Sequence, residues 1–176
     1  MKRTITRLLV AAFFISTFAF SGCGIYSFNP KGTLDPEVKT VNVHIIENQA
    51  QYVNPQLLPN LTDRVKQKIT RQTKLSQTNR DDADLDIKGT IVEYSTMTTG
   101  VSNNNGQSQA SVNRLTVSVK MTIANQLKKE DPKDVTVSRS FDFPANQSLN
   151  QAESQLLDEM VRNLSDEIFN RIFSDW

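Results

Sequence analysis

The segment of residues 114–123 alternates polar and apolar side chains without a break, and it places the strongest limit on the fold. Its apolar residues fall at every second position: Leu115, Val117, Val119, Met121 and Ile123. A repeat of two puts these side chains on one face of a β-strand and the polar ones on the other. The segment therefore predicts a strand in a sheet with one face covered by an apolar layer and the other face wet.

Three more segments carry the same repeat of two. They are residues 38–46, 85–91 and 135–143, the last of which is closed by Pro144. Residues 47–54 are polar and predict a loop. Residues 95–111 are rich in Ser, Thr, Asn and Gly, so we expect a long, flexible connection between the second and third strands.

Two segments carry the repeat of an amphipathic helix. The first begins at Asn54-Pro55 or at Pro59 and ends near Thr73. The second begins at Asn150, which with Glu153 has the form of a capping box. The apolar stripes consist of Leu58, Leu61, Val65 and Ile69 in the first helix and of Ala152, Leu156, Met160, Leu164, Ile168 and Ile172 in the second.

The order of these elements is β-α-β-β-β-α. One face of a sheet can bury the apolar faces of both helices. We therefore predict an α+β fold, a two-layer sandwich with two helices packed on one face of a four-stranded sheet. The opposite face is then either a solvated surface or a dedicated ligand face. It would carry Thr40, Asn42, His44, Lys88, Thr90, Arg114, Thr116, Ser118, Lys120, Thr136, Ser138 and Ser140.

The N-terminal residues have the layout of a secretory signal peptide. Lys2, Arg3 and Arg7 precede an apolar run over residues 8–20, which is too short to span a membrane as a helix. The run ends in Ser21-Gly22-Cys23. This ending resembles the lipobox of bacterial lipoproteins, and the resemblance implies cleavage before the cysteine and lipidation of its thiol.

The resulting organisation has three parts. We expect a lipoprotein signal peptide over residues 1–22, a tether over residues 23–36 that is lipidated at Cys23, and one domain over residues 37–176. The whole chain has 20 basic and 19 acidic side chains, so its net charge is +1. Removal of the signal peptide takes away three cations and no acid, which leaves −2. Binding to nucleic acid through phosphates needs a basic surface, so nucleic acid is not expected as a partner.

The sequence offers little for catalysis or for metal binding. It has one His and one Cys, which excludes an intrachain disulfide and clusters of these ligands. No G-x-S-x-G motif is present to hold a nucleophilic serine, which argues against a hydrolase. Residues 81–86 (DDADLD) look like the start of a calcium loop, but the required Gly is missing. We expect no catalytic residue, no metal and no cofactor.

Short motifs along the chain occur in a familiar order. They are CGIYSF from Cys23 to Phe28, VKTV from Val38 to Val41, Ala83-Asp84-Leu85 followed by Gly89 and Tyr94, NRLTV from Asn113 to Val117, and FSDW from Phe173 to Trp176. Together they resemble the LptE family in its Bacteroidetes-type form, over nearly the whole chain after the signal peptide. The resemblance implies a fold of two helices on a four-stranded sheet, and it agrees with the element order derived above.

The resemblance also implies a function. An LptE-type protein is a lipoprotein of the outer membrane that faces the periplasm and catalyses no reaction. It plugs the LptD-type β-barrel, helps this barrel to assemble, and assists the insertion of lipopolysaccharide into the outer leaflet. The implied partners are the barrel, lipopolysaccharide, and the membrane through the lipid anchor.

Lipid A carries phosphates, which pair with Lys or Arg. Lys88, Arg114 and Lys120 lie on the predicted outer face of the sheet, so they are our candidates for contact with these phosphates. The alternative is a periplasmic lipoprotein that serves as a pilot or structural adaptor for another envelope complex.

Overall fold

The computed structural model describes residues 35–104 and 107–173, and for residues 101–110 it describes the backbone alone. By its internal contacts the chain divides into Met1–Pro30 and Lys31–Trp176, and all described residues belong to the second unit. The predicted signal peptide, the lipidation site Cys23 and most of the predicted tether lie outside the described residues.

Three long strands form the main part of the sheet. They are β4 (Leu85–Asn104), β5 (Gln107–Asn125) and β6 (Lys133–Pro144). Both neighbouring pairs are antiparallel, with Val119 of β5 opposite Ile91 of β4 on one side and opposite Val137 of β6 on the other. The alternation that predicted these strands therefore also sets their register, because all three apolar faces point to the same side.

Three short strands complete the sheet along the free edge of β4. They are β1 (Thr40–Val43), β2 (Glu47–Asn48) and β3 (Ser76–Gln77). The strand order is β3-β1-β4-β5-β6, and β2 also pairs with β4. The prediction of four strands was therefore too low, and the loop predicted over residues 47–54 contains β2. Two-residue strands carry no periodicity of their own and form only because β1 and β4 offer open edges.

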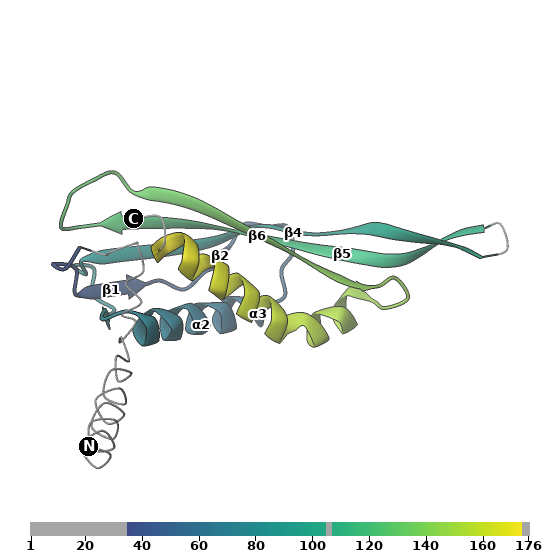
Figure 1. Cartoon of the computed structure of the whole chain (residues 1–176), viewed down its shortest axis with the longest axis horizontal. Helices are drawn as coiled ribbons and strands as arrows, with labels where there is room; N and C mark the ends of the chain where they lie inside the picture. Colours follow the sequence, from purple (N-terminus) through teal and green to yellow (C-terminus); the bar gives the residue numbers. More distant parts are fainter. Residues whose placement is uncertain (1–34, 105–106, 174–176) are drawn as a thin grey trace, which may run out of the picture. The chain divides into compact units, whose positions relative to one another are not determined.

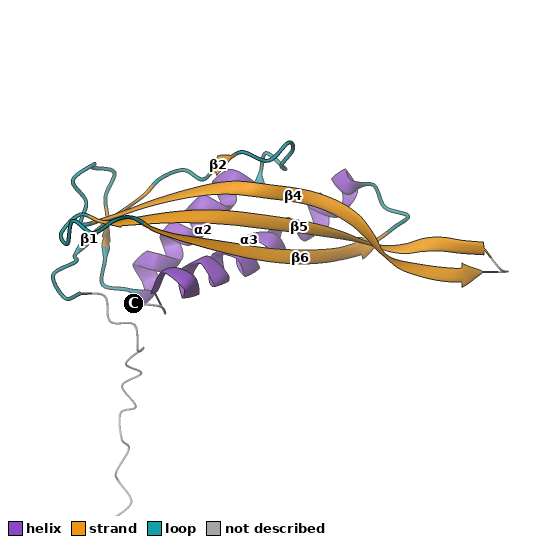
Figure 2. Ribbon diagram, turned by 90° about the horizontal axis from the view of Figure 1, so that it is seen from above, coloured by secondary structure: helices purple, strands orange, loops and turns teal. Residues whose placement is uncertain are grey.

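Both helices pack on the same face of the sheet, as predicted (Figures 1 and 2). They are α2 (Leu57–Gln72) and α3 (Leu149–Phe173). Fully buried residues from each layer form one core, for example Leu61 and Ile69 of α2, Leu164 of α3, and Leu115 and Met121 of β5. The predicted stripes are mostly correct, but Leu57 rather than Leu58 is fully buried, and Leu156 is half-buried.

The helix starts differ from the predictions by a few residues. Asn54 accepts a hydrogen bond from the backbone N–H of Gln56 and so forms a turn ahead of α2, instead of capping it. At α3 the reciprocal pair is Ser148 and Gln151, whose side chains bond each other's backbone N–H groups at 3.4 and 3.3 Å. The capping box predicted from Asn150 and Glu153 was therefore wrong by two positions.

The connection predicted over residues 95–111 is in fact a continuation of the two strands. β4 and β5 stay paired out to Asn104 and Gln107, with register shifts on either side of Gly100. The pairing of β6 with β5 reaches only to Val112, so from there the hairpin continues past α3 as a two-stranded ribbon (Figures 1 and 2).

Candidate functional site

The outer face of the sheet, on the side away from the helices, is lined with polar side chains that bond one another across the strands. At its centre Ser118 of β5 donates a hydrogen bond of 2.8 Å to Glu93 of β4, and its oxygen lies 3.0 Å from the hydroxyl of Ser138 on β6. Thr116 and Ser140 form the next cross-strand pair at 3.0 Å. These bonds join three strands, so the face is an ordered polar surface.

A β-bulge in β4 places Glu93 on this face. Ile91 pairs with Val119 and Glu93 pairs with Ser118, so Val92 is an extra residue that has no partner on β5. The bulge keeps both Ile91 and Tyr94 in the core, although they are separated by three positions. Without it, Glu93 would turn toward the helices.

Arg114, one of the three predicted phosphate contacts, lies on the outer face opposite Asp142. Its Nε and Nη2 atoms donate to the two carboxylate oxygens at 2.6 and 2.8 Å. The hydrogen bonds to Arg114 hold the pKa of Asp142 below its usual range, and the same contacts raise the pKa of Arg114. The pair is bidentate, so both carboxylate oxygens of Asp142 and two N–H groups of Arg114 are used within the chain.

Lys120 and Lys88 also lie on this face, and each has a carboxylate partner. Lys120 Nζ is 2.7 Å from Asp134 Oδ2, and the hydrogen bonds from Lys120 and then Thr122 lower the pKa of Asp134. Lys88 Nζ is 3.6 Å from Asp86, which also lies 2.6 Å from the ring of His44.

The structure thus places the three predicted residues on one face but not in one cluster. Lys88 pairs with Thr122, two residues from Lys120 along β5, so these two lysines are diagonal neighbours. Arg114 lies six residues away from Lys120, about 20 Å along the strand. Among the described side chains of β4 to β6, the acids on this face are Asp86, Glu93, Asp134 and Asp142. Since the cations are three, the face is polar and paired but not basic.

Glu153 forms a second polar cluster, which the sequence did not reveal. This side chain is 3% exposed, and its two oxygens accept hydrogen bonds from Tyr94 at 2.6 Å and from Tyr52 at 2.9 Å. The tyrosine rings meet edge to face with their centroids 5.6 Å apart. Burial, and then the bond to Glu153, raises the pKa of Tyr94 far above its usual value. The cluster joins α3 to β4 and to the segment before α2.

The acidic run at residues 81–86 forms contacts within the fold. Asp84 accepts hydrogen bonds from the backbone N–H groups of Lys39 and Thr40, which lower its pKa, and Asp82 pairs with Arg80. Asp86 faces His44 and Lys88. Among the described residues no three His, Cys, Asp or Glu side chains are grouped so that they could hold a metal ion.

Neither helix of the described part of the chain is long and apolar enough to cross a membrane. α3 is the longer of the two, and charged residues occur along its whole length. Its apolar residues face the sheet and α2, so they are used in the core of the domain.

Comparison with solved structures identifies proteins of the same general fold. A protein from Xanthomonas campestris is 10% identical, with a TM-score of 0.53 over 80% of this chain and 90% of its own. A minor lipoprotein from Acinetobacter baumannii is 18% identical, with a TM-score of 0.46 over 78% and 94%. Rare lipoprotein B from Shewanella oneidensis is 12% identical, with a TM-score of 0.48 over 76% and 93%. At these identities the likeness concerns the fold, and the first of the three supports it.

The sequence itself matches a family profile. No curated protein matches the chain, but the profile described as LptE: Lipopolysaccharide-assembly matches residues 38–172. The match runs from the residues just before β1 almost to the end of α3 and so covers the sheet and both helices. The resemblance inferred from the motifs is thereby confirmed. The chain belongs to the LptE family of envelope lipoproteins, which act in lipopolysaccharide assembly and are not enzymes.

Proposed function

We propose that this protein is lipidated at Cys23, resides at the outer membrane facing the periplasm, and plugs an LptD-type β-barrel. In this position it helps the barrel to assemble and assists the insertion of lipopolysaccharide into the outer leaflet. Membership in a lipopolysaccharide-assembly family supports a role in lipopolysaccharide insertion, and the surface of the domain supports a position inside the barrel.

The outer face of the sheet is the main support for the proposal that the domain plugs a barrel. The lumen of a transmembrane barrel is polar, so a plug needs a surface whose charged groups are paired or hydrogen-bonded. On this face Arg114, Lys120 and Lys88 each have a carboxylate partner, and Ser and Thr hydroxyls fill the space between them. Such a surface loses little when it leaves bulk water for a polar lumen.

Affinity purification of the tagged protein from outer membranes tests this function. We expect a large LptD-type barrel to be recovered with it, and lipopolysaccharide to be bound. The pilot or adaptor alternative predicts instead a different envelope complex and no lipopolysaccharide. Recovery of a different envelope complex, with no barrel, would overturn the proposal that the protein plugs a barrel. A Cys23→Ala variant should lose its own anchor and remain in the membrane fraction only while it is bound to the barrel.

The part played by the β4–β5 ribbon can be tested in the same experiment. Replacement of residues 99–112 by Asn-Gly would close a two-residue turn between Thr98 and Asn113, which face each other in register. Because most of the core lies elsewhere, we expect this variant to fold and to recover less barrel. Full recovery would show that the ribbon does not contribute to the complex.

Lys88, Arg114 and Lys120 remain our candidates for contact with lipid A phosphates, and their ion pairs dictate the design of the test. A simple reversal of Arg114 would set two acids side by side, so we use the exchange Arg114→Asp with Asp142→Arg, which keeps the pair. If Arg114 contacts a phosphate, the exchanged protein should bind lipopolysaccharide more weakly while its unfolding midpoint stays the same. Unchanged binding in the exchanged protein and in Lys88→Glu and Lys120→Glu variants would contradict the assignment.

A further inference from the structure

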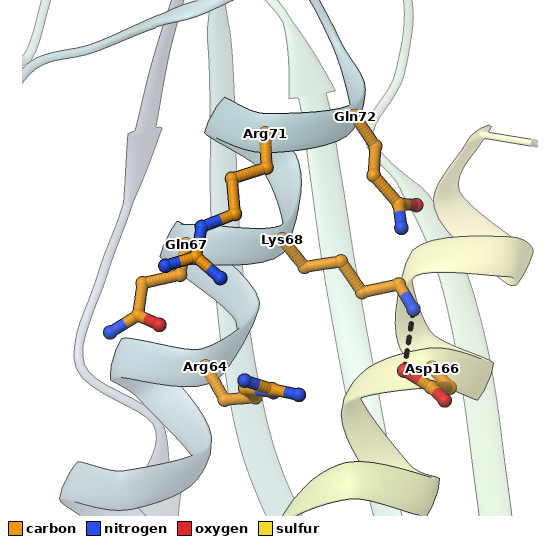
Figure 3. A pocket seen from close by; sticks show the side chains of 6 residues that line it. All are labelled: Arg64, Gln67, Lys68, Arg71, Gln72 and Asp166. Carbon is orange, nitrogen blue, oxygen red and sulfur yellow. Dashed lines mark hydrogen bonds and ion pairs between the residues drawn. The ribbon is translucent and has the colours of Figure 1, made fainter.

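The helical layer contains a groove between α2 and α3 that the proposed function does not use. Its volume is about 100 Å³, and it is lined by Arg64, Gln67, Lys68, Arg71 and Gln72 of α2 and by Asp166 of α3 (Figure 3). Lys88, Arg114 and Lys120 lie on the opposite face of the sheet, so the two sets of cations are separate. The space is sufficient for several water molecules or for one small anion.

The three cations of the groove come from one stripe of α2. Arg64, Lys68 and Arg71 are spaced by four and three residues, so they start from one stripe of the helix. In Figure 3, Lys68 and Arg64 extend toward α3, and the guanidinium of Arg71 lies beside Gln67. The helices also differ in charge. Within Leu57–Gln72 there are four cations and one acid, whereas Leu149–Phe173 has five acids and two cations. The sequence alone could have shown this stripe, although not the wall that faces it.

Lys68 is the fixed member of the group. Its Nζ lies 2.5 Å from Asp166 Oδ1 and 5.5 Å from the centre of the Phe169 ring, and the side chain is 17% exposed. This ammonium is therefore neutralised by a partner and held by a ring. It forms one wall of the groove, and its charge is already satisfied.

Arg64 and Arg71 are different, because neither guanidinium has a carboxylate partner among the described residues. The nearest further acid of α3 in sequence, Glu167, is bound by Arg139 and Arg171. Three cations and one acid leave the groove with an excess of two positive charges. Gln67 and Gln72 add amide donors at its rim.

We propose that this groove binds a phosphate monoester group, with Arg64 and Arg71 as its charged donors. A guanidinium presents two parallel N–H groups that match two oxygens of a phosphate. A carboxylate has two oxygens and can satisfy one such fork, whereas the three terminal oxygens of a phosphate monoester can serve both. The phosphate belongs either to the headgroup of a lipid or to a small soluble molecule. This inference does not depend on the plug, since it concerns the helical layer alone.

The test uses the full chain in neutral detergent micelles and observes the Nε–Hε signals of Arg64 and Arg71 by NMR. One arm adds inorganic phosphate. The other adds phosphatidic acid to the micelles, with phosphatidylcholine as the neutral headgroup control. The variant Arg64→Gln/Arg71→Gln is compared with Lys66→Gln/Lys74→Gln, which removes the same charge from the same region without touching the groove.

We expect saturable shifts of both arginine signals and an affinity about tenfold or more lower in the arginine variant, from the loss of charge-assisted hydrogen bonds. The lysine variant should bind nearly as tightly as the wild type. Shifts with phosphatidic acid alone identify a lipid headgroup, and shifts with both probes identify the phosphate group itself as sufficient. Shifts with inorganic phosphate alone point to a soluble ligand. Equal weakening in the two variants, or no shift with either probe, would overturn the proposal.

Discussion

The two ends of the β4–β5 hairpin are built from the same backbone pairing but are stabilised in different ways. At the covered end, residues 85–94 and 112–125, every second side chain is buried beneath α2 and α3. At the distal end, residues 95–111, the described side chains are mostly exposed, and beyond the end of β6 the two strands extend past the helices (Figure 2). Here the strands are held by their own ladder of hydrogen bonds and by the anchored end.

This difference shows why one hairpin can both form the core of the domain and extend beyond it as a polar ribbon. Burial fixes the register of the covered end, since a slip of one residue would turn its apolar side chains into water. The distal end lacks that constraint, and it contains the register shifts next to Gly100. The sequence of this segment is rich in Ser, Thr, Asn and Gln. Such a strand pair can lie in a polar environment without losing its structure, which is what the proposed barrel lumen would demand.

The largest expected effect comes from a pair of residues that face each other across the boundary. Leu115 is fully buried, whereas its partner in register, Thr96, is exposed. Leu115→Ala should lower the free energy of unfolding by about 2–5 kcal/mol, while Thr96→Ala should change it by less than about 0.5 kcal/mol. Urea unfolding of both variants measures this contrast. Similar losses would mean that the distal end contributes to the core after all.

A second contrast concerns the buried Glu153. Tyr94→Phe removes a hydroxyl at a site that is 9% exposed, so one carboxylate oxygen loses its donor away from water. We expect a loss of about 1–3 kcal/mol in the free energy of unfolding. Tyr52→Phe removes the other donor, but Tyr52 is 45% exposed and water can replace it. A smaller loss for Tyr52→Phe in the same unfolding experiment would confirm that burial makes the difference.

The two glycines of the hairpin offer a third comparison. A Cβ atom at Gly89 would lie 2.9 Å from Ile46 Cγ1 and 3.0 Å from Met121 Sδ, both in the core. Gly89→Ala should therefore cost about 1–3 kcal/mol by overpacking. At Gly100 the nearest atom is the hydroxyl of Ser111 at 2.9 Å, which is exposed and can rotate. Thermal unfolding should show a smaller shift for Gly100→Ala, and the reverse order would contradict our account of the covered end.

The raised pKa of Tyr94 predicts a dependence on alkaline pH. Below about pH 10 the residue is protonated in both the folded and the unfolded chain, so its contribution to stability is fully present. Above that pH the unfolded chain loses the proton while the folded chain retains it, and stability falls. The stability of the wild type should thus decline more steeply from pH 9 to 11 than that of Tyr94→Phe. Parallel declines in denaturant midpoints would refute the assignment.

The smallest effect is expected on the outer face of the sheet. Arg114→Gln removes the cation that lowers the pKa of Asp142, so this pKa should return toward the usual carboxyl value. Both side chains are solvent-exposed, and the unfolding midpoint at neutral pH should hardly change. The contribution of the pair is present above the usual carboxyl pKa and is lost as the pH falls through the lowered value. NMR titration of the Asp142 carboxyl carbon measures the shift.

The periodicity of the sequence predicted the long strands and both helices because each has one face in the core. The prediction from periodicity failed in segments that have no face in the core. Residues 95–111 lack apolar alternation, so they resembled a loop, although Asn105-Gly106 at their centre is a typical signal of a tight hairpin turn. The strands β2 and β3 are too short to carry a repeat, and Glu153 was assigned to a helix cap because its tyrosine partners are distant in sequence.

The sequence by itself determined the two layers, the side of the sheet that is buried, and the family, because local periodicity and ordered motifs carry that information. Only the tertiary structure decided which charges meet. Arg114 finds Asp142, Lys120 finds Asp134, and Lys68 finds Asp166 through contacts between residues 14 to 98 positions apart. Such partners depend on register and helix packing, which bring distant residues together and, in the part of the chain that the structure describes, give Arg64 and Arg71 no carboxylate partner.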